Sequence, residues 1–176
     1  MRSPDSRALY ENWQALRRPN ALPRLDQLSN RTDQNALAGV FVLNAAPTTG
    51  FDILASGRRL ADLFGSLAEG GGFLDLAPRD RDFRDRQRIL STLVLQEAPL
   101  LAHSVVHWKT NGTGGAPDPM ALEEVYLPVT TSFARVTHIV GFFAHLDQDG
   151  QGEIIPVSHG LESWELCSFS FMSCVI

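Results

Sequence analysis

Five short stretches of the chain, rich in apolar residues and separated by turn residues or helical patterns, have the character of β-strands. The clearest is residues 100–109, where successive side chains divide into an apolar row and a mixed row. A turn at residues 47–50 separates the first two stretches and predicts a hairpin. The predicted strands are residues 39–45, 51–56, 100–109, 120–130 and 135–146.

Helical spacing of apolar residues appears in three other stretches. Ser3 followed by Pro4 is a typical helix start, and the residues after it place an apolar stripe opposite a charged face. A short helical piece ends at Gly65, and a longer helix is predicted over residues 79–97, before Pro99. The inward-facing residues of the three helices are predicted to be Leu9, Trp13 and Leu16, then Leu60, Leu63 and Phe64, and then Phe83, Leu90, Leu93 and Val94.

The sheet is predicted to have an inner face, covered by the helical region of residues 57–97, and an outer face. The last strand is apolar on both faces, and a sheet with one wet face would alternate cleanly. We therefore expect the N-terminal helix, with Trp13, to cover the outer face. The outer face is predicted to carry Leu101, His103, Val105, His107, Ile139 and Phe143.

Seven short motifs follow one another from Trp13 to Gly141, within residues 9–146. They are Trp13-x-x-Leu16-Arg17, Pro23-Arg24-x-Asp26, a strand ending in FVLNA, Gly57-Arg58-x-Leu60-x-x-Leu63-Phe64-Gly65, Phe73-Leu74, Leu127-Pro128-Val129 and Gly141. In this order and spacing they resemble the PAS fold, in particular the stand-alone PAS-like domain of bacterial regulators. The resemblance implies an α+β domain with a five-stranded antiparallel sheet, helices on its inner face and the N-terminal helix on its outer face. It also implies a sensory or regulatory module that is not an enzyme.

Three regions are predicted from this organisation. An N-terminal helix and loop occupy residues 1–37, a PAS-like domain occupies residues 38–147, and a C-terminal tail occupies residues 148–176. The tail ends in SWELCSFSFMSCVI, an apolar and aromatic segment that is expected to pack on the domain or on a partner.

Composition narrows the possible classes of protein. A length of 176 residues favours one domain with a tail, and a net charge of −5 argues against nucleic-acid binding, which needs a positive surface. The N-terminus has no apolar run typical of a signal peptide, and no stretch approaches the length of a membrane span. The two cysteines, Cys167 and Cys174, lie at the end of the sequence and form no disulfide framework. These features predict a cytoplasmic protein.

No arrangement of residues in the sequence indicates catalysis or metal binding. His103 and His107 lie on one face of one strand, about 13 Å apart, which is too far for both to hold one metal ion. Glu123 and Glu124 are adjacent, so their side chains should point to opposite faces of a strand and cannot act as a pair.

The resemblance also bears on cofactors. PAS domains that bind haem usually present a histidine from the long helix, and residues 79–97 contain none. Flavin-binding photosensory PAS domains carry a reactive cysteine in an Asn-Cys-Arg motif, whereas no cysteine precedes Cys167 here. We therefore expect no cofactor.

The first hypothesis for function is a PAS-like regulatory module that binds a small ligand in a core cavity, docks on a signalling partner such as a kinase or regulator, or does both. A second is a small-molecule enzyme that uses His138 or Glu124 as acid or base, and a third is a protein–protein adaptor whose cavity is filled by its own side chains. The predicted cavity is lined by Phe64, Phe73, Leu93, Ser104, Val106, Trp108, Val125 and Leu127.

A homodimer centred on Trp13 is also predicted. The N-terminal helix is narrower than a five-stranded sheet, so apolar surface should remain beside it and could be covered by a second copy. The predicted dimer or partner surface consists of Leu9, Tyr10, Trp13, Leu16, His103 and His107.

Overall fold

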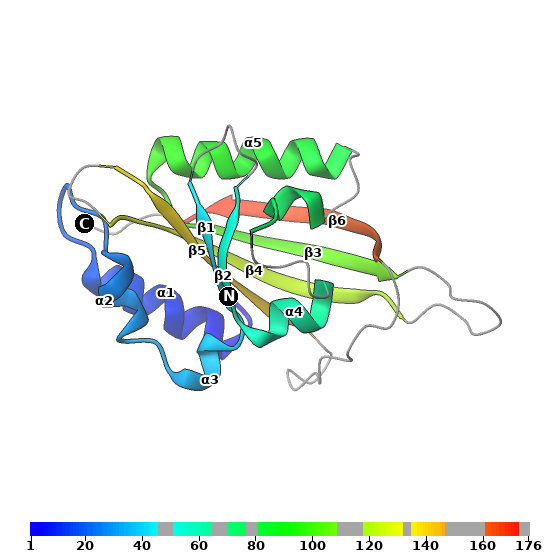
Figure 1. Ribbon diagram of the computed structural model, residues 1–176, viewed down its shortest axis with the longest axis horizontal. Helices are drawn as coiled ribbons and strands as arrows, with labels where there is room; N and C mark the ends of the chain where they lie inside the picture. Colours follow the sequence, from blue (N-terminus) through cyan, green and yellow to red (C-terminus); the bar gives the residue numbers. More distant parts are fainter. Residues whose placement is uncertain are drawn as a thin grey trace.

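The computed structural model describes residues 1–45, 51–64, 70–76, 81–108, 118–131, 135–146 and 161–172. Among these residues the N-terminal part forms three helices and a strand, followed by a second strand, two shorter helical segments and a long helix, and then four long strands (Figure 1). The elements are α1 (Pro4–Leu16), α2 (Leu25–Ser29), α3 (Gln34–Leu37), β1 (Val40–Asn44), β2 (Ile53–Ser56), α4 (Arg58–Phe64), the 3₁₀ helix η2 (Phe73–Leu76), α5 (Arg81–Gln96), β3 (Leu100–Trp108), β4 (Met120–Val129), β5 (His138–His145) and β6 (Leu161–Phe171). Among the described residues, no helix has both the length and the apolar character needed to cross a membrane.

The strands form one antiparallel sheet in the order β2-β1-β5-β4-β3-β6. The expected antiparallel α+β architecture is confirmed, but the sheet has six strands and not five. The additional strand, β6, comes from the segment expected to be a C-terminal tail, and it pairs along the whole of β3. Its apolar residues explain this placement, because Trp164 loses nearly all its exposed surface when the strand joins the sheet.

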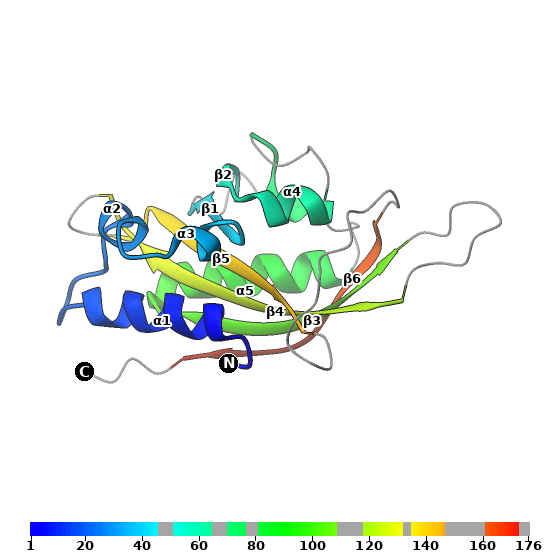
Figure 2. The same ribbon diagram turned by 90° about the horizontal axis from the view of Figure 1, so that it is seen from below.

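Helix α1 covers the outer face of β4 and β5 (Figure 2). The Ser3 hydroxyl accepts a hydrogen bond from the Ser6 backbone N–H and caps the helix, and proline follows at the first helical position. Trp13 is fully buried, and its indole Nε1 donates to the Pro128 carbonyl over 2.8 Å. The expectation that the N-terminal helix covers the outer face is confirmed.

Helices α4, η2 and α5 cover the inner face and enclose the larger core. Aromatic rings fill its centre, with Phe41 and Phe143 centroids 4.8 Å apart and Phe41 and Phe73 centroids 5.2 Å apart. The Phe41 ring lies directly against Gly141 of β5, where an added Cβ would be 2.1 Å from the ring. Only glycine fits at this point, because any other residue would displace the aromatic core.

The predicted faces of β4 and β5 were wrong. Val125 and Leu127 lie on the outer face against α1 and α2, whereas Ile139 and Phe143 lie in the inner core. Both strands are buried on both sides, so hydrophobicity does not reveal which alternate set points inward. The pairing does reveal it, because Val125 is directly opposite Leu101, and opposite residues in an antiparallel pair share a face.

Candidate functional site

A buried ion pair lies at the centre of the inner face, between α5 and the sheet. Arg86 of α5 binds the Glu124 carboxylate of β4 with two hydrogen bonds, Nη1 to Oε2 over 2.7 Å and Nη2 to Oε1 over 3.2 Å. The two side chains are only 2% and 0% exposed. Two-point pairing of this kind fixes both the position and the plane of the guanidinium group. The pair therefore attaches the long helix to one position of the sheet.

Three more side chains complete the surroundings of the carboxylate. The Tyr126 hydroxyl donates to Glu124 Oε2 over 2.6 Å, and the Ser104 hydroxyl donates to Oε1. The Trp164 indole Nε1 donates to Ser104 Oγ over 2.9 Å and to Glu124 Oε1 over 3.0 Å. The Arg86 guanidinium also stacks on Trp164, with 3.6 Å between its central carbon and the ring centroid. We call Arg86, Ser104, Glu124, Tyr126 and Trp164 the Glu124 cluster.

The cluster keeps its charges fixed around neutral pH. Burial acts to raise the pKa of Glu124, but the positive charge and hydrogen bonds of Arg86, with those of Ser104 and Tyr126, hold that pKa below its ordinary value. Burial and the adjacent Glu124 carboxylate raise the pKa of Tyr126 well above its ordinary value. Glu124 is therefore ionised and Tyr126 protonated, and all the donors point at the carboxylate. A carboxylate held in this way is suited to anchoring a helix and poorly suited to taking a proton from a substrate.

The residues predicted to line a ligand cavity divide into two groups. Phe73, Leu93 and Val106 lie in the inner core with Phe64 packed against it, while Ser104 belongs to the Glu124 cluster. Val125 and Leu127 lie on the other face of the sheet, and the side chain of Trp108 lies outside the described part of the structure.

The inner group is closely packed around Trp164. The Trp164 ring centroid lies 5.0 Å from that of Phe64 and 5.6 Å from that of Phe73. Rings at these separations are in contact, so the side chains themselves occupy the space between them.

The predicted partner surface is also revised. Leu9 and Trp13 are 1% and 0% exposed within a single chain, so the prediction that they form a dimer surface is wrong. The cause is that α2 and the residues around it pack beside α1 and complete its apolar contacts, with Leu28 buried in the same core. The other residues of the predicted surface are Tyr10 and Leu16, which are half-buried against this core, and His103 and His107 on the outer face.

Glu123, the neighbour of Glu124, anchors the start of α1. Its carboxylate accepts hydrogen bonds from the backbone N–H groups of Arg2 over 2.6 Å and Ser3 over 3.1 Å, and His103 Nε2 lies 3.5 Å away. Burial acts to raise the pKa of Glu123, but the Arg2 and Ser3 donors and the hydroxyl of Ser6 hold it below its ordinary value. The two glutamates point to opposite faces of β4, as predicted, and each holds a different helix.

The cluster was missed from the sequence, although a signal for it was present. Arg86 falls between Phe83 and Leu90 at helical spacing, so it is a charged residue on the buried stripe of α5. Ser104 and Glu124 likewise interrupt the apolar rows of their strands. A buried charge needs a partner of opposite charge, so Arg86 and Glu124 could have been paired by this criterion.

A comparison with protein-family models agrees with the fold. A protein-family model described as a PAS domain matches residues 1–144. The chain belongs to the PAS domain family. In a search of solved structures, this PAS domain is similar to the PAS domain from Bordetella pertussis BvgS, with 14% sequence identity and a TM-score of 0.44. The match covers 62% of this chain and 77% of that chain. No curated protein matches the sequence.

Family membership gives the Glu124 cluster its context. PAS domains are in general sensory modules, and the helices on the inner face of the sheet enclose the region where the sequence predicted a ligand cavity. In this PAS domain that region holds an ion pair surrounded by aromatic side chains.

Proposed function

We propose that this PAS domain is a non-catalytic regulatory module that acts through protein contacts and whose inner face is closed to small-molecule ligands by its own side chains. The observation that carries the proposal is the Glu124 cluster. A ligand between α5 and the sheet would have to displace Arg86 or Trp164 from Glu124. Separating a buried ion pair costs about 3–5 kcal/mol, because the remaining charge is left without a partner or water. The closed arrangement therefore dominates.

The geometry of the titratable groups supports a non-catalytic role. His138 lies at the start of β5 opposite Val129, whereas Glu124 lies opposite Phe143. His138 and Phe143 are five positions apart, about 17 Å along the strand, which is too far for both groups to act on one small substrate. Burial also lowers the pKa of His138, and its Nδ1 lies 2.8 Å from the Thr137 hydroxyl.

Native mass spectrometry tests the closed core. The expected result is the mass of the chain, or of a whole-number multiple of it, without a bound small molecule. A stoichiometric non-covalent adduct that is bound between α5 and the sheet and is released on denaturation would overturn the proposal.

We further propose that the protein contact includes self-association through the surface where the end of α5 meets β6. Leu95 and Phe169 are 83% and 44% exposed. Leu95 is the penultimate residue of α5 and lies five positions before Leu100, and Leu100 is paired with Phe171, two residues from Phe169. Phe169 is opposite the inner-face residue Ala102, so it lies on the same side of the sheet as α5. We assign these two exposed apolar side chains to one surface, which we call the α5–β6 surface.

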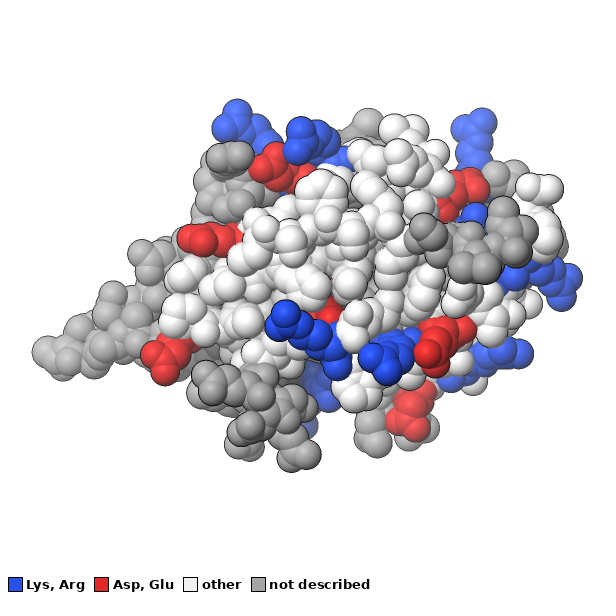
Figure 3. Space-filling model, turned by 180° about the vertical axis from the view of Figure 1, so that it is seen from behind, with Lys and Arg blue, Asp and Glu red and all other residues white. Residues whose placement is uncertain are grey.

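Charge supports a second copy of the chain as the occupant of this surface. Each chain has a net charge of −5, so a contact between two copies meets the least repulsion where neither copy carries charged side chains. Figure 3, which views the molecule from the side of β6, shows a broad uncharged area with charged side chains mostly around it. Within residues 164–172, Glu165 is the single charged residue.

Light scattering on variants tests this contact. The unmodified chain at about tens of micromolar should have a dimeric mass, and Leu95→Glu/Phe169→Glu should be monomeric, because it places like charges in the contact. The control is Leu54→Glu, which changes a 49% exposed leucine on the opposite edge strand, β2, and should remain dimeric. A monomeric mass for the unmodified chain, or a dimer that survives the double substitution, would refute the assignment.

A further inference from the structure

A surface pocket lies where the loop between α1 and α2 meets the end of β4. Its volume is about 280 Å³. The walls come from four parts of the chain: the end of α1 with the following loop and α2, the residue after α5, the residue after β4, and the segment before β5. The residues that line it are Ala15, Leu16, Arg18, Asn20, Ala21, Leu22, Arg24, Gln27, Arg31, Glu97, Thr130 and Arg135.

Positive charge is concentrated in this pocket. Four arginines and one glutamate line it, so its formal charge is +4 − 1 = +3, whereas the whole chain is −5. The arginines come from separate positions in the sequence and converge only in the fold. Within the described part of the chain, Arg18, Arg31 and Arg135 form no ion pair. Their mutual repulsion is a cost that an anion in the pocket would relieve.

The backbone around the pocket is held in place by hydrogen bonds. Arg18 and Ala21 exchange backbone hydrogen bonds of 3.1 and 3.3 Å, which closes the loop after α1. The Leu25 N–H donates to the Thr130 carbonyl, and the Thr130 N–H donates to the Pro23 carbonyl, each over 3.0 Å. These bonds attach the loop to the end of β4. The pocket is therefore a formed part of the fold and not a gap between independent segments.

Two further features mark the pocket as a prepared site. Arg24 is oriented by two hydrogen bonds to Asp26, from Nε over 3.0 Å and from Nη2 over 3.3 Å, so less side-chain freedom remains to be lost on binding. In the described part of the chain, three non-glycine residues have positive φ, and two of them, Asn20 at 62° and Glu97 at 52°, line this pocket. Such backbone strain is concentrated at functional sites in proteins.

We infer that this pocket binds a small molecule carrying a phosphate group. Guanidinium groups bind phosphate oxygens through paired hydrogen bonds, and several arginines match the two charges of a phosphate monoester better than the single charge of a carboxylate. The volume is at the lower limit of small-molecule sites and fits a compact ester. This site lies outside the core, so it adds a ligand to the proposed regulatory module without opening the Glu124 cluster.

Nuclear magnetic resonance titration of the full chain tests this inference. Inorganic phosphate and glycerol phosphate are added at constant ionic strength, with succinate as a dicarboxylate of similar charge. Both phosphates should give saturable shifts of the backbone amides of the non-proline residues among 18–31 and of Thr130 and Arg135, with dissociation constants at least tenfold lower than that of succinate. The absence of saturable shifts, or equal affinity for succinate, would overturn the assignment to phosphate.

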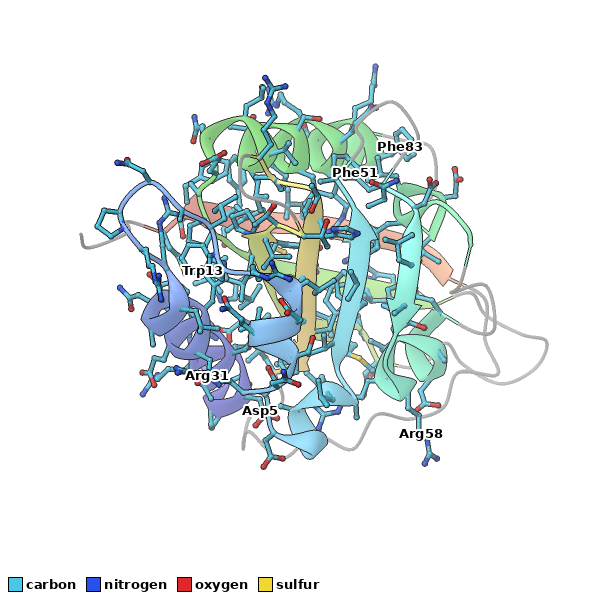
Figure 4. The ribbon with its side chains drawn as sticks, turned by 60° about the vertical axis from the view of Figure 1, so that its left-hand side comes forward. Asp5, Trp13, Arg31, Phe51, Arg58 and Phe83 are labelled. Atoms are coloured by element: carbon cyan, nitrogen blue, oxygen red, sulfur yellow. The ribbon has the colours of Figure 1, made fainter. Side chains whose placement is uncertain are left out.

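Paired variants locate the binding site. Arg31→Ala/Arg135→Ala removes two exposed arginines of the pocket and should weaken phosphate binding at least tenfold. Arg58→Ala/Arg88→Ala removes the same charge from α4 and α5, and it should leave the dissociation constant within about twofold of the unmodified value. Arg31 and Arg58 lie on well-separated parts of the molecule (Figure 4). Equal weakening by both variants would show non-specific attraction and refute the site.

The Arg31→Ala/Arg135→Ala variant also distinguishes a ligand in the surface pocket from a ligand in the core. A small adduct that is seen by native mass spectrometry and lost in Arg31→Ala/Arg135→Ala belongs to the surface pocket and leaves the proposed function intact. An adduct retained in that variant is bound elsewhere and counts against the closed core.

Discussion

Replacing Arg86 by methionine is the most direct test of the Glu124 cluster. Methionine keeps much of the length of the arginine side chain, so the substitution removes the charge while limiting the cavity. Glu124 is then a fully buried carboxylate without its cation, although Ser104, Tyr126 and Trp164 still donate to it.

The expected loss of stability is large. Breaking a buried ion pair by removing one partner costs about 3–5 kcal/mol, a substantial fraction of the roughly 5–15 kcal/mol that stabilises a typical domain. The stacking of the guanidinium on Trp164, whose centroid is 3.6 Å away, is lost as well. The double variant Arg86→Met/Glu124→Leu leaves neither charge, so it should recover much of the loss relative to Arg86→Met alone.

Urea unfolding measures both effects. With a slope of about 2 kcal/mol per molar urea, Arg86→Met should lower the midpoint by about 2 M. The loss should also depend on pH. Without Arg86, burial raises the pKa of Glu124 above its unfolded value, so Arg86→Met should regain stability as the pH falls and the carboxyl becomes protonated.

The unmodified protein should behave in the opposite way. Its Glu124 pKa is depressed, so the stability that this group contributes is present above the unfolded pKa and is lost as the pH falls through the folded pKa. An Arg86→Met variant within about 1 kcal/mol of the unmodified protein would refute the reasoning, since it would mean that the pair is hydrated and not structural.

Two further predictions concern other parts of the sheet. Gly141→Ala should lower the free energy of unfolding by at least about 1–3 kcal/mol, since its Cβ would lie 2.1 Å from the Phe41 ring. In urea unfolding, adding Phe41→Leu to Gly141→Ala should recover part of this loss. An unfolding midpoint unchanged by Gly141→Ala would contradict this packing. The depressed pKa of Glu123 means that its contribution to docking α1 is present above the ordinary glutamate pKa and is lost as the pH falls through the folded value. Amide hydrogen exchange of Pro4–Leu16 should therefore speed up at low pH, after correction for the intrinsic rate, and Glu123→Gln should remove this pH dependence; an unaltered dependence would place the anchor elsewhere.

Much of the fold was accessible from the sequence, because its elements carry strong periodic patterns. The amphipathic stripe of α1 predicted both the helix and its position on the outer face, and the alternation in β3 predicted which of its side chains face inward. The strands expected at residues 120–130 and 135–146 were found as β4 and β5. Their faces were not accessible from hydrophobicity alone, since nearly every residue of both strands is buried.

The candidate site was harder to predict because its members are far apart in the sequence. Trp164 reaches Ser104 only because β6 pairs with β3, and nothing local to residues 161–171 specifies that pairing. The assignment of Trp13 to a dimer surface failed for a related reason. The helix was treated as a lone cover for the sheet, whereas Leu28 of α2 packs into the same core and helps to bury the indole.

The arginine-lined surface pocket and the α5–β6 surface are connected through α5, which leads to a last prediction. Glu97, directly after α5, lines the arginine pocket, and its carbonyl accepts a hydrogen bond of 3.0 Å from Arg17 Nη1 at the end of α1. Leu95 of the proposed dimer surface lies two residues earlier in the same helix. Phosphate that orders the pocket would therefore act on the end of the helix that presents Leu95.

The coupling free energy between two binding events is reciprocal. If phosphate changes the affinity of the dimer, dimerisation must therefore change the affinity for phosphate by the same factor. A coupling of about 1 kcal/mol corresponds to a roughly fivefold change in the dimer dissociation constant, which sedimentation equilibrium resolves. The effect of phosphate on the dimer dissociation constant should disappear in Arg31→Ala/Arg135→Ala and persist in Arg58→Ala/Arg88→Ala. A dimer dissociation constant that is the same with and without saturating phosphate would show that the two surfaces act independently, because a ligand bound equally well by monomer and dimer cannot shift the equilibrium between them.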